Sequence, residues 1–208
     1  MRTTLPALVL GLAVGLSTAA QAQGPAIGIK GGLNVSNLHV DEANDENSRI
    51  GFNVGVFGRT MPEEPIGLQV ELLYSSKGTH TTYSGVFGIV DQDVDFNLNY
   101  LELPVLIGFR LGQMLEIQAG GYAGYLLSAK ASTSGDLGSG SDELDKDNFA
   151  SMDFGVVGGI ALNFGTAQIG ARYNFGLAEV ADSDAAKAVL GDAKNACAQI
   201  YLAIGLGH

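Results

Sequence analysis

Six acidic and amide side chains are spaced like the ligands of a calcium-binding loop. They take positions 1, 3, 5, 7, 9 and 12 of one segment: Asp91, Asp93, Asp95, Asn97, Asn99 and Glu102. Phe96 stands where such a loop needs glycine for its sharp turn, and no helix is indicated on either side. A β-strand that enters from an acidic loop produces the same alternation. We therefore expect a loop over about 78–95 that leads into a strand, with no metal ion and no cofactor.

Histidine and serine residues are the other candidates for chemistry. Ser76 and Ser84 lie near His80 in the sequence, whereas His39 and His208 lie far from it. A hydrolytic site needs a nucleophile, a base and an orienting acid within hydrogen-bond reach, and nothing in this spacing indicates one. We therefore predict that the protein is not an enzyme. A lipid- or peptide-modifying barrel enzyme is the alternative.

Charge and cysteine content exclude other classes of protein. The formal net charge of −11 over 208 residues disfavours a nucleic-acid partner. Cys197 is the only cysteine, so the chain has no intrachain disulfide and no cluster of thiolate ligands. Most acidic residues gather in four segments that resemble loops, around 41–46, 91–95, 136–147 and 179–192. We expect the function to be either structural or mediated by these acidic loops, which would meet a protein partner or cations.

The elements that position the charged residues are indicated most clearly between residues 100 and 128. Apolar residues at every second position alternate with polar residues and glycine, on both sides of a short joint at 112–114. Each half is long enough to cross a bilayer, for which about nine to eleven tilted residues suffice. The two faces predict a hairpin with lipid on one side and a polar lumen on the other. Pro104 removes a ladder hydrogen bond, so we expect a bulge or kink there.

The same alternation recurs along the whole chain and predicts eight strands. Their ranges are 26–36, 50–59, 66–77, 100–111, 115–128, 150–163, 167–177 and 198–208. Long and short connections alternate between them, as in bacterial barrels with long outer loops and short periplasmic turns. Closure removes edge strands that would expose unpaired backbone to lipid. The predicted fold is all-β, an eight-stranded antiparallel up-and-down transmembrane β-barrel over residues 23–208.

The charged residues of the predicted strands share the inward phase. They are Lys30, Arg59, Glu71, Glu102, Arg110, Glu116, Asp153 and Arg172. An eight-stranded barrel is just wide enough for side chains to fill, so we expect these charges to pair in a filled lumen and not to line an open pore. A soluble periplasmic barrel that binds an apolar ligand would require the two faces to be reversed.

The N-terminus carries the features of a secretory signal peptide. Arg2 precedes an apolar run at 5–16, and Ala20, Gln21 and Ala22 fit a cleavage site with small residues. We predict a signal peptide at residues 1–22 and a barrel that resides in the outer membrane after cleavage. The predicted partners are outer-membrane lipid and the barrel-assembly machinery, and the predicted state is a monomer.

Three sequence patterns resemble outer-membrane β-barrel domain proteins of the PorT type. They are GIKGGLNVSNL at 28–38, LLYSSKG at 72–78 and NYLELP at 99–104, and the segment from Tyr201 onward is compatible. The resemblance covers the chain after residue 22 and implies an integral outer-membrane protein, some members of the family being linked to protein secretion across that membrane. The chain departs from many such barrels by ending on His208 instead of an aromatic residue read by the assembly machinery, and by lacking tryptophan.

Overall fold

The computed structural model describes residues 26–39, 48–60, 65–84, 91–135, 140–144, 149–181 and 193–206. The expected signal peptide, the terminal His208 and most acidic residues of the expected loops lie outside these ranges. The strands are β1 Ala26–His39, β2 Arg49–Arg59, β3 Ile66–Ser84, β4 Asp91–Leu111, β5 Leu115–Gly135, β6 Gly140–Leu144, β7 Met152–Phe164, β8 Ala167–Glu179 and β9 Lys194–Gly205. Within these ranges no helix has the length and apolar character needed to cross a membrane.

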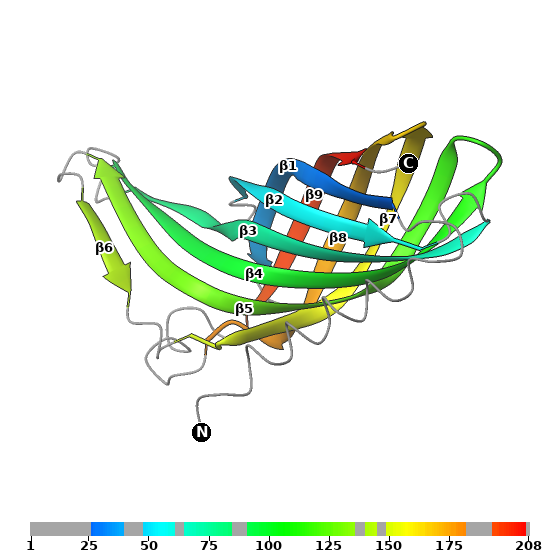
Figure 1. Cartoon of the computed structure of the whole chain (residues 1–208). Helices are drawn as coiled ribbons and strands as arrows, with labels where there is room; N and C mark the ends of the chain where they lie inside the picture. Colours follow the sequence, from blue (N-terminus) through cyan, green and yellow to red (C-terminus); the bar gives the residue numbers. More distant parts are fainter. Residues whose placement is uncertain are drawn as a thin grey trace, which may run out of the picture.

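Eight of the strands form a closed antiparallel barrel (Figure 1). The hydrogen-bonded order is β4-β3-β2-β1-β9-β8-β7-β5, and pairing of β4 with β5 closes the ring. Gly112 and Gly165 adopt positive φ angles of 70° and 63° in the tight turns that join β4 to β5 and β7 to β8, a conformation that glycine adopts without strain. The predicted eight-stranded barrel is confirmed.

The predicted loops are wrong at the end of the barrel that carries the long connections. β3 runs on to Ser84 and β4 begins at Asp91, so most of the segment expected as a loop at 78–95 is strand. β5 reaches Gly135, and β6, which was not predicted, pairs beside it and lies outside the ring (Figure 1). The segment from Asp91 to Glu102 pairs with strands on both sides, so it cannot curl into a calcium-binding loop.

A β-bulge interrupts the barrel near Tyr100 and not at Pro104. The β4–β5 ladder is regular through Pro104, and the β3–β4 ladder omits Leu103 and Pro104 without a shift of register. The register shifts between Asn99 and Tyr100, which face Ser128 and Leu126. Leu127 is thus the additional residue, and its insertion reverses the alternation of β5 from that point onward. Proline therefore breaks the ladder locally, as expected, but the expected bulge lies elsewhere.

The outer face of the barrel is apolar on all eight strands. Representative side chains are Ile29, Val56, Leu72, Val105, Ile117, Val156, Ile169 and Leu202, each about half exposed. The inward positions carry the buried polar and charged residues. An apolar exterior of this extent needs lipid around it, and the inward positions that the structure describes are mainly polar. The alternative of a soluble ligand-binding barrel is therefore wrong, because its faces would be reversed.

Candidate functional site: the charged lumen

Most of the inward charges expected from the sequence lie in the lumen. Six of them are buried, namely Lys30, Glu71, Glu102, Glu116, Asp153 and Arg172. The side chain of Arg59 is 11% exposed. Arg110 is only partly buried, because it lies next to the tight turn where β4 ends. Lys77 is fully buried in the lumen as well, although the expected set of charges omits it.

The first layer of ion pairs lies nearest the short turns. Arg59 Nη2 on β2 lies 3.0 Å from Glu116 Oε1 on β5. The same guanidinium donates to Gln69 Oε1 at 2.6 Å and 3.0 Å, and Nη1 donates to Asn163 Oδ1 on β7 at 3.4 Å. Asn163 Nδ2 in turn donates to Glu116 Oε2 at 3.3 Å. β2 and β7 are four places apart in a ring of eight strands, so this layer connects opposite walls.

In the second layer one carboxylate is shared by two cations. Lys30 Nζ lies 3.0 Å from both oxygens of Glu71, and Arg172 Nη2 lies 3.0 Å and 2.7 Å from the same oxygens. Both cations also lie over the ring of Tyr201, Lys30 Nζ at 3.5 Å and the Arg172 guanidinium carbon at 4.7 Å from its centroid. β3 and β8, which carry Glu71 and Arg172, are again opposite in the ring. We call Lys30, Glu71 and Arg172 the basic triad.

In the third layer one ammonium is shared by two carboxylates. Lys77 Nζ lies 2.5 Å from Glu102 Oε1 and 3.4 Å from Asp153 Oδ2. The contact with Glu102 is an ion pair whose angles do not meet those of a hydrogen bond. Asp153 also accepts hydrogen bonds from the Tyr122 hydroxyl at 3.2 Å and from Asn195 Nδ2 at 3.0 Å. Lys77 Nζ lies over the Tyr122 ring, 4.5 Å from its centroid. We call Lys77, Glu102 and Asp153 the acidic triad.

The amide of Asn34 ties four neighbouring strands together inside the lumen. Its Oδ1 accepts from Asn53 Nδ2 at 2.6 Å and from Gln199 Nε2 at 3.0 Å. Its Nδ2 donates to Ser75 Oγ at 3.0 Å. Such buried amides leave little conformational freedom, because each bond lost would strand a polar group away from water.

The two triads have opposite excess charge. The basic triad carries one more positive than negative group, and the acidic triad carries one more negative than positive group. Together with the Arg59–Glu116 pair, the two triads contain four basic and four acidic side chains, so this network of ion pairs is neutral overall. A carboxylate held by two cations is not available as a base, so the arrangement suits cross-linking of the barrel walls better than proton transfer.

Metal binding and hydrolysis have little support among the residues that the structure describes. In these residues no group of three or more histidine, cysteine, aspartate or glutamate side chains is placed to hold a metal ion. Ser76 is buried, and its hydroxyl accepts a hydrogen bond from Arg49 Nη1 at 3.3 Å. The side chains of His39, His80 and Ser84 lie outside the part of the chain that the structure describes.

Sequence reasoning missed Lys77 and the role of Tyr201. Lys77 shares the odd-numbered phase of Glu71 and Ser75 on β3, so the alternation itself could have identified it. It escaped notice because the expected strand ended there. No signal in the sequence indicates that two cations from β1 and β8 meet on the ring of Tyr201, since that contact depends on closure of the barrel.

A closed eight-stranded barrel with an apolar exterior and a cross-linked polar lumen defines the class of integral outer-membrane β-barrels. A family model described as "Outer membrane protein beta-barrel domain" matches residues 19–182, and the chain belongs to this family. The protein therefore resides in the outer membrane. A comparison with curated proteins gives no match.

Solved barrels of two bacteria are similar in structure. Neisserial surface protein A superposes with a TM-score of 0.52 at 13% sequence identity, covering 88% of this chain and 100% of that one. The attachment invasion locus protein Ail of Yersinia pestis, solved in complex with the heparin analogue sucrose octasulfate, gives a TM-score of 0.48 at 17% identity over 88% of this chain and 99% of its own. The likeness to Neisserial surface protein A shows the fold.

Proposed function

We propose that the protein is a non-enzymatic, monomeric outer-membrane anchor, a rigid barrel that presents its acidic loops to a protein partner or to cations. The observation that carries this proposal is the lumen, in which the Glu71–Arg172 ion pair and the Arg59–Asn163 hydrogen bond each join opposite walls. Side chains that bridge the walls leave no continuous path for a solute, and they hold the barrel in one shape. Function then falls to the connections, where most of the acidic residues lie.

The same proposal covers how the protein reaches the outer membrane and which process it supports there. Residues 1–22 act as a signal peptide that is removed during export, and the barrel-assembly machinery inserts the remaining chain into outer-membrane lipid. The barrel is of the PorT type and supports secretion of proteins across the outer membrane. The strand patterns at 28–38, 72–78 and 99–104 support this placement.

A loop variant in a deletion strain tests the proposal. Asp41, Glu42, Asp45 and Glu46 are replaced together by Asn and Gln, which removes the acidic charge of the first long connection. The matched control replaces Glu63 and Glu64 by Gln in a short connection at the opposite end of the barrel. Secreted proteins are quantified by mass spectrometry of the medium, and membrane insertion is checked by gel mobility of unheated samples.

We expect deletion of the gene to lower secretion. Expression of the wild-type protein or of the control variant should restore it. The loop variant is expected to insert normally and to fail in secretion. Unchanged secretion in the deletion strain would remove the secretion role. Full restoration by the loop variant would show that the acidic charge of that loop is not what the partner reads.

A further inference from the structure

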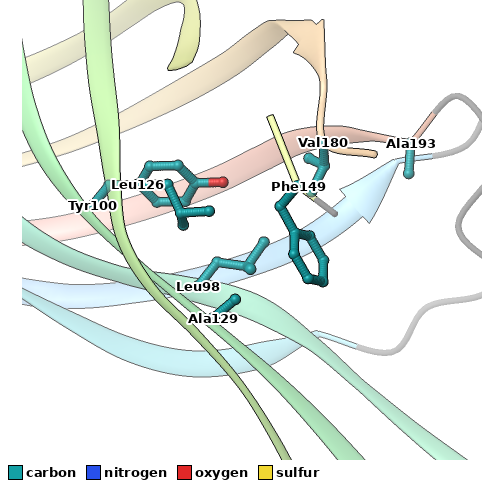
Figure 2. Close-up of a cluster of buried hydrophobic side chains, with 7 residues drawn as sticks. All are labelled: Leu98, Tyr100, Leu126, Ala129, Phe149, Val180 and Ala193. Atoms are coloured by element: carbon teal, nitrogen blue, oxygen red, sulfur yellow. The ribbon is translucent and has the colours of Figure 1, made fainter. Parts of the chain in front are cut away.

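A cluster of apolar side chains lies in the lumen at the end with the long connections (Figure 2). Its members are Leu98, Tyr100, Leu126, Ala129, Phe149, Val180 and Ala193, each at most 6% exposed. The rest of the lumen is lined mainly by charged and amide side chains. This apolar layer therefore differs in chemistry from the three layers of ion pairs below it.

The β-bulge at Leu127 creates the strand side of the apolar layer. Leu126 and Ala129 are three residues apart, so a regular strand would direct them to opposite faces. The additional residue restores the inward direction for Ala129, and both side chains are buried. Leu98 and Tyr100 on β4 complete this side. The bulge thus supplies apolar side chains to the lumen at the level where β4 and β5 leave the ring.

The bases of two long connections form the other side of the apolar layer. Phe149 precedes β7, Val180 follows β8, and Ala193 precedes β9. Backbone hydrogen bonds join them: Ala150 N donates to Val180 O at 2.9 Å, and Val180 N donates to Ala193 O at 2.9 Å. Phe149 also forms an antiparallel bridge with Ala181. The ends of the connections are therefore part of the packed barrel.

Tyr100 lies at the boundary between the apolar layer and the acidic triad. Its ring packs in the layer, while its hydroxyl accepts a hydrogen bond from Asn195 Nδ2 at 3.3 Å. The same nitrogen donates to Asp153 of the acidic triad at 3.0 Å. The charged network thus begins directly below the apolar side chains on this side of the lumen.

We propose that the apolar layer is a solvent seal that keeps water and ions outside the barrel away from the triads, with the Phe149 side chain as its central plug. Apolar walls give water no hydrogen-bond partners, and a filled apolar constriction is a barrier to ions. The proposal rests on the proposed function, because a rigid anchor requires ion pairs that are not weakened by water. In this proposal, the ends of the two long connections, next to β7 and between β8 and β9, help to close the barrel.

Cys197 provides a native reporter for the seal. It is the only cysteine of the chain, it is 1% exposed, and it lies on β9 two residues after Asn195, which donates to Asp153 of the acidic triad. A reagent that enters from the long-connection end must pass the apolar layer to reach it. In bacterial barrels of this topology that end faces the cell exterior.

The experiment labels intact cells with a membrane-impermeant cationic methanethiosulfonate reagent. The extracted protein is analysed by mass spectrometry, and heat-unfolded protein gives the fully labelled reference. We compare the wild type with Phe149→Ala and with the matched control Phe154→Ala, which removes an aromatic ring from the outer face of β7. Val180→Ser serves as a second, milder opening of the apolar layer.

We expect Cys197 of the wild type and of Phe154→Ala to remain unlabelled over the time in which the heated reference is complete. Phe149→Ala should label faster by on the order of a hundredfold, because loss of a buried ring weakens the packing that opening must disrupt. Val180→Ser should show a smaller increase in the same direction, and it carries the test if Phe149→Ala does not reach the membrane.

Two results would overturn the seal. One is rapid labelling of the wild-type protein, and the other is wild-type protection of Cys197 in both Phe149→Ala and Val180→Ser while they migrate as folded barrels. Either result leaves the proposed function intact if the acidic-loop variant still fails in secretion. If Cys197 of the wild type is protected and the loop variant secretes fully, the proposed seal stands and the proposed function of the acidic loop is wrong.

Discussion

Glu71→Gln is the substitution that tests the basic triad most sharply. Glu71 is the only carboxylate shared by Lys30 and Arg172, and both cations lie within 3.0 Å of it. Glutamine preserves the volume of the side chain but removes its charge, so two buried cations lose the group that neutralises them. We expect the variant to insert into membranes with a lower free energy of unfolding.

The expected loss is about 3–5 kcal/mol, the usual cost of leaving a buried charge without its partner. A charge pair about 4 Å apart is worth roughly 4 kcal/mol at an effective dielectric constant near 20. Two such pairs are lost, but the amide oxygen of glutamine still accepts one hydrogen bond from a cation. Two pairs at roughly 4 kcal/mol, less about 1.5–3 kcal/mol for that hydrogen bond, leave roughly 5–6.5 kcal/mol, so the loss should lie at or just above the upper end of the range.

The matched control is Lys30→Met, which removes one of the two cations. Glu71 then keeps both contacts with Arg172, so we expect a loss of only about 1–2 kcal/mol from one ion pair and one cation–π contact. The double variant should be more stable than Glu71→Gln alone, because only one cation is left without a partner. This order of three stabilities follows from the sharing of one carboxylate.

Urea titration of the purified barrel in detergent micelles, followed by the fraction of compact unheated band, gives the free energies of unfolding. The sharing of Glu71 by two cations is refuted if Glu71→Gln costs no more than Lys30→Met. It is also refuted if the double variant is the least stable of the three, since additivity would show that the two cations do not share Glu71.

Three further substitutions test other parts of the molecule by the same titration. Lys77→Met leaves Glu102 and Asp153 without the cation that they share, and it should lower the free energy of unfolding by about 3–5 kcal/mol. Glu102→Gln should cost less, and equal losses for the two variants would contradict the acidic triad. Gly170→Ala places a Cβ atom 2.4 Å from the Tyr201 ring and should cost about 1–3 kcal/mol by overpacking, and an unchanged stability would show that the ring moves freely. Val105→Lys puts a charge on the lipid face midway along the barrel part of β4 and should lower the free energy of unfolding by about 2–4 kcal/mol. Val105→Leu should leave the stability unchanged. An unchanged stability of the lysine variant would show that Val105 does not face lipid.

The sequence predicted the barrel where its two faces meet different surroundings. Alternation places Val105 outside and Glu102 inside on β4, because lipid and lumen demand opposite side chains. This contrast disappears where strands leave the membrane. Thr79–Ser84 and the aspartates of β4 therefore resembled a loop, although β-branched residues such as Thr81 and Thr82 also favour strands.

The pairing of charges in the lumen could not be predicted from the alternation. A period of two gives the direction of Glu71, but its contact with Arg172 joins strands that are opposite in the closed ring. The depth at which two such residues meet is set by the stagger of the strands, which no short segment encodes. The β-bulge at Leu127 likewise has no mark in the sequence, and it alone directs Ala129 into the lumen.

Side chains fill the lumen and should close it to solutes. The most direct test is the electrical conductance of the purified wild-type protein in planar lipid bilayers bathed in concentrated potassium chloride. Insertion is verified by the heat-dependent gel mobility of protein recovered from the same preparation. We expect the current to remain at the level of the protein-free bilayer. Stable conductance steps that appear with insertion would contradict a lumen bridged by the two triads.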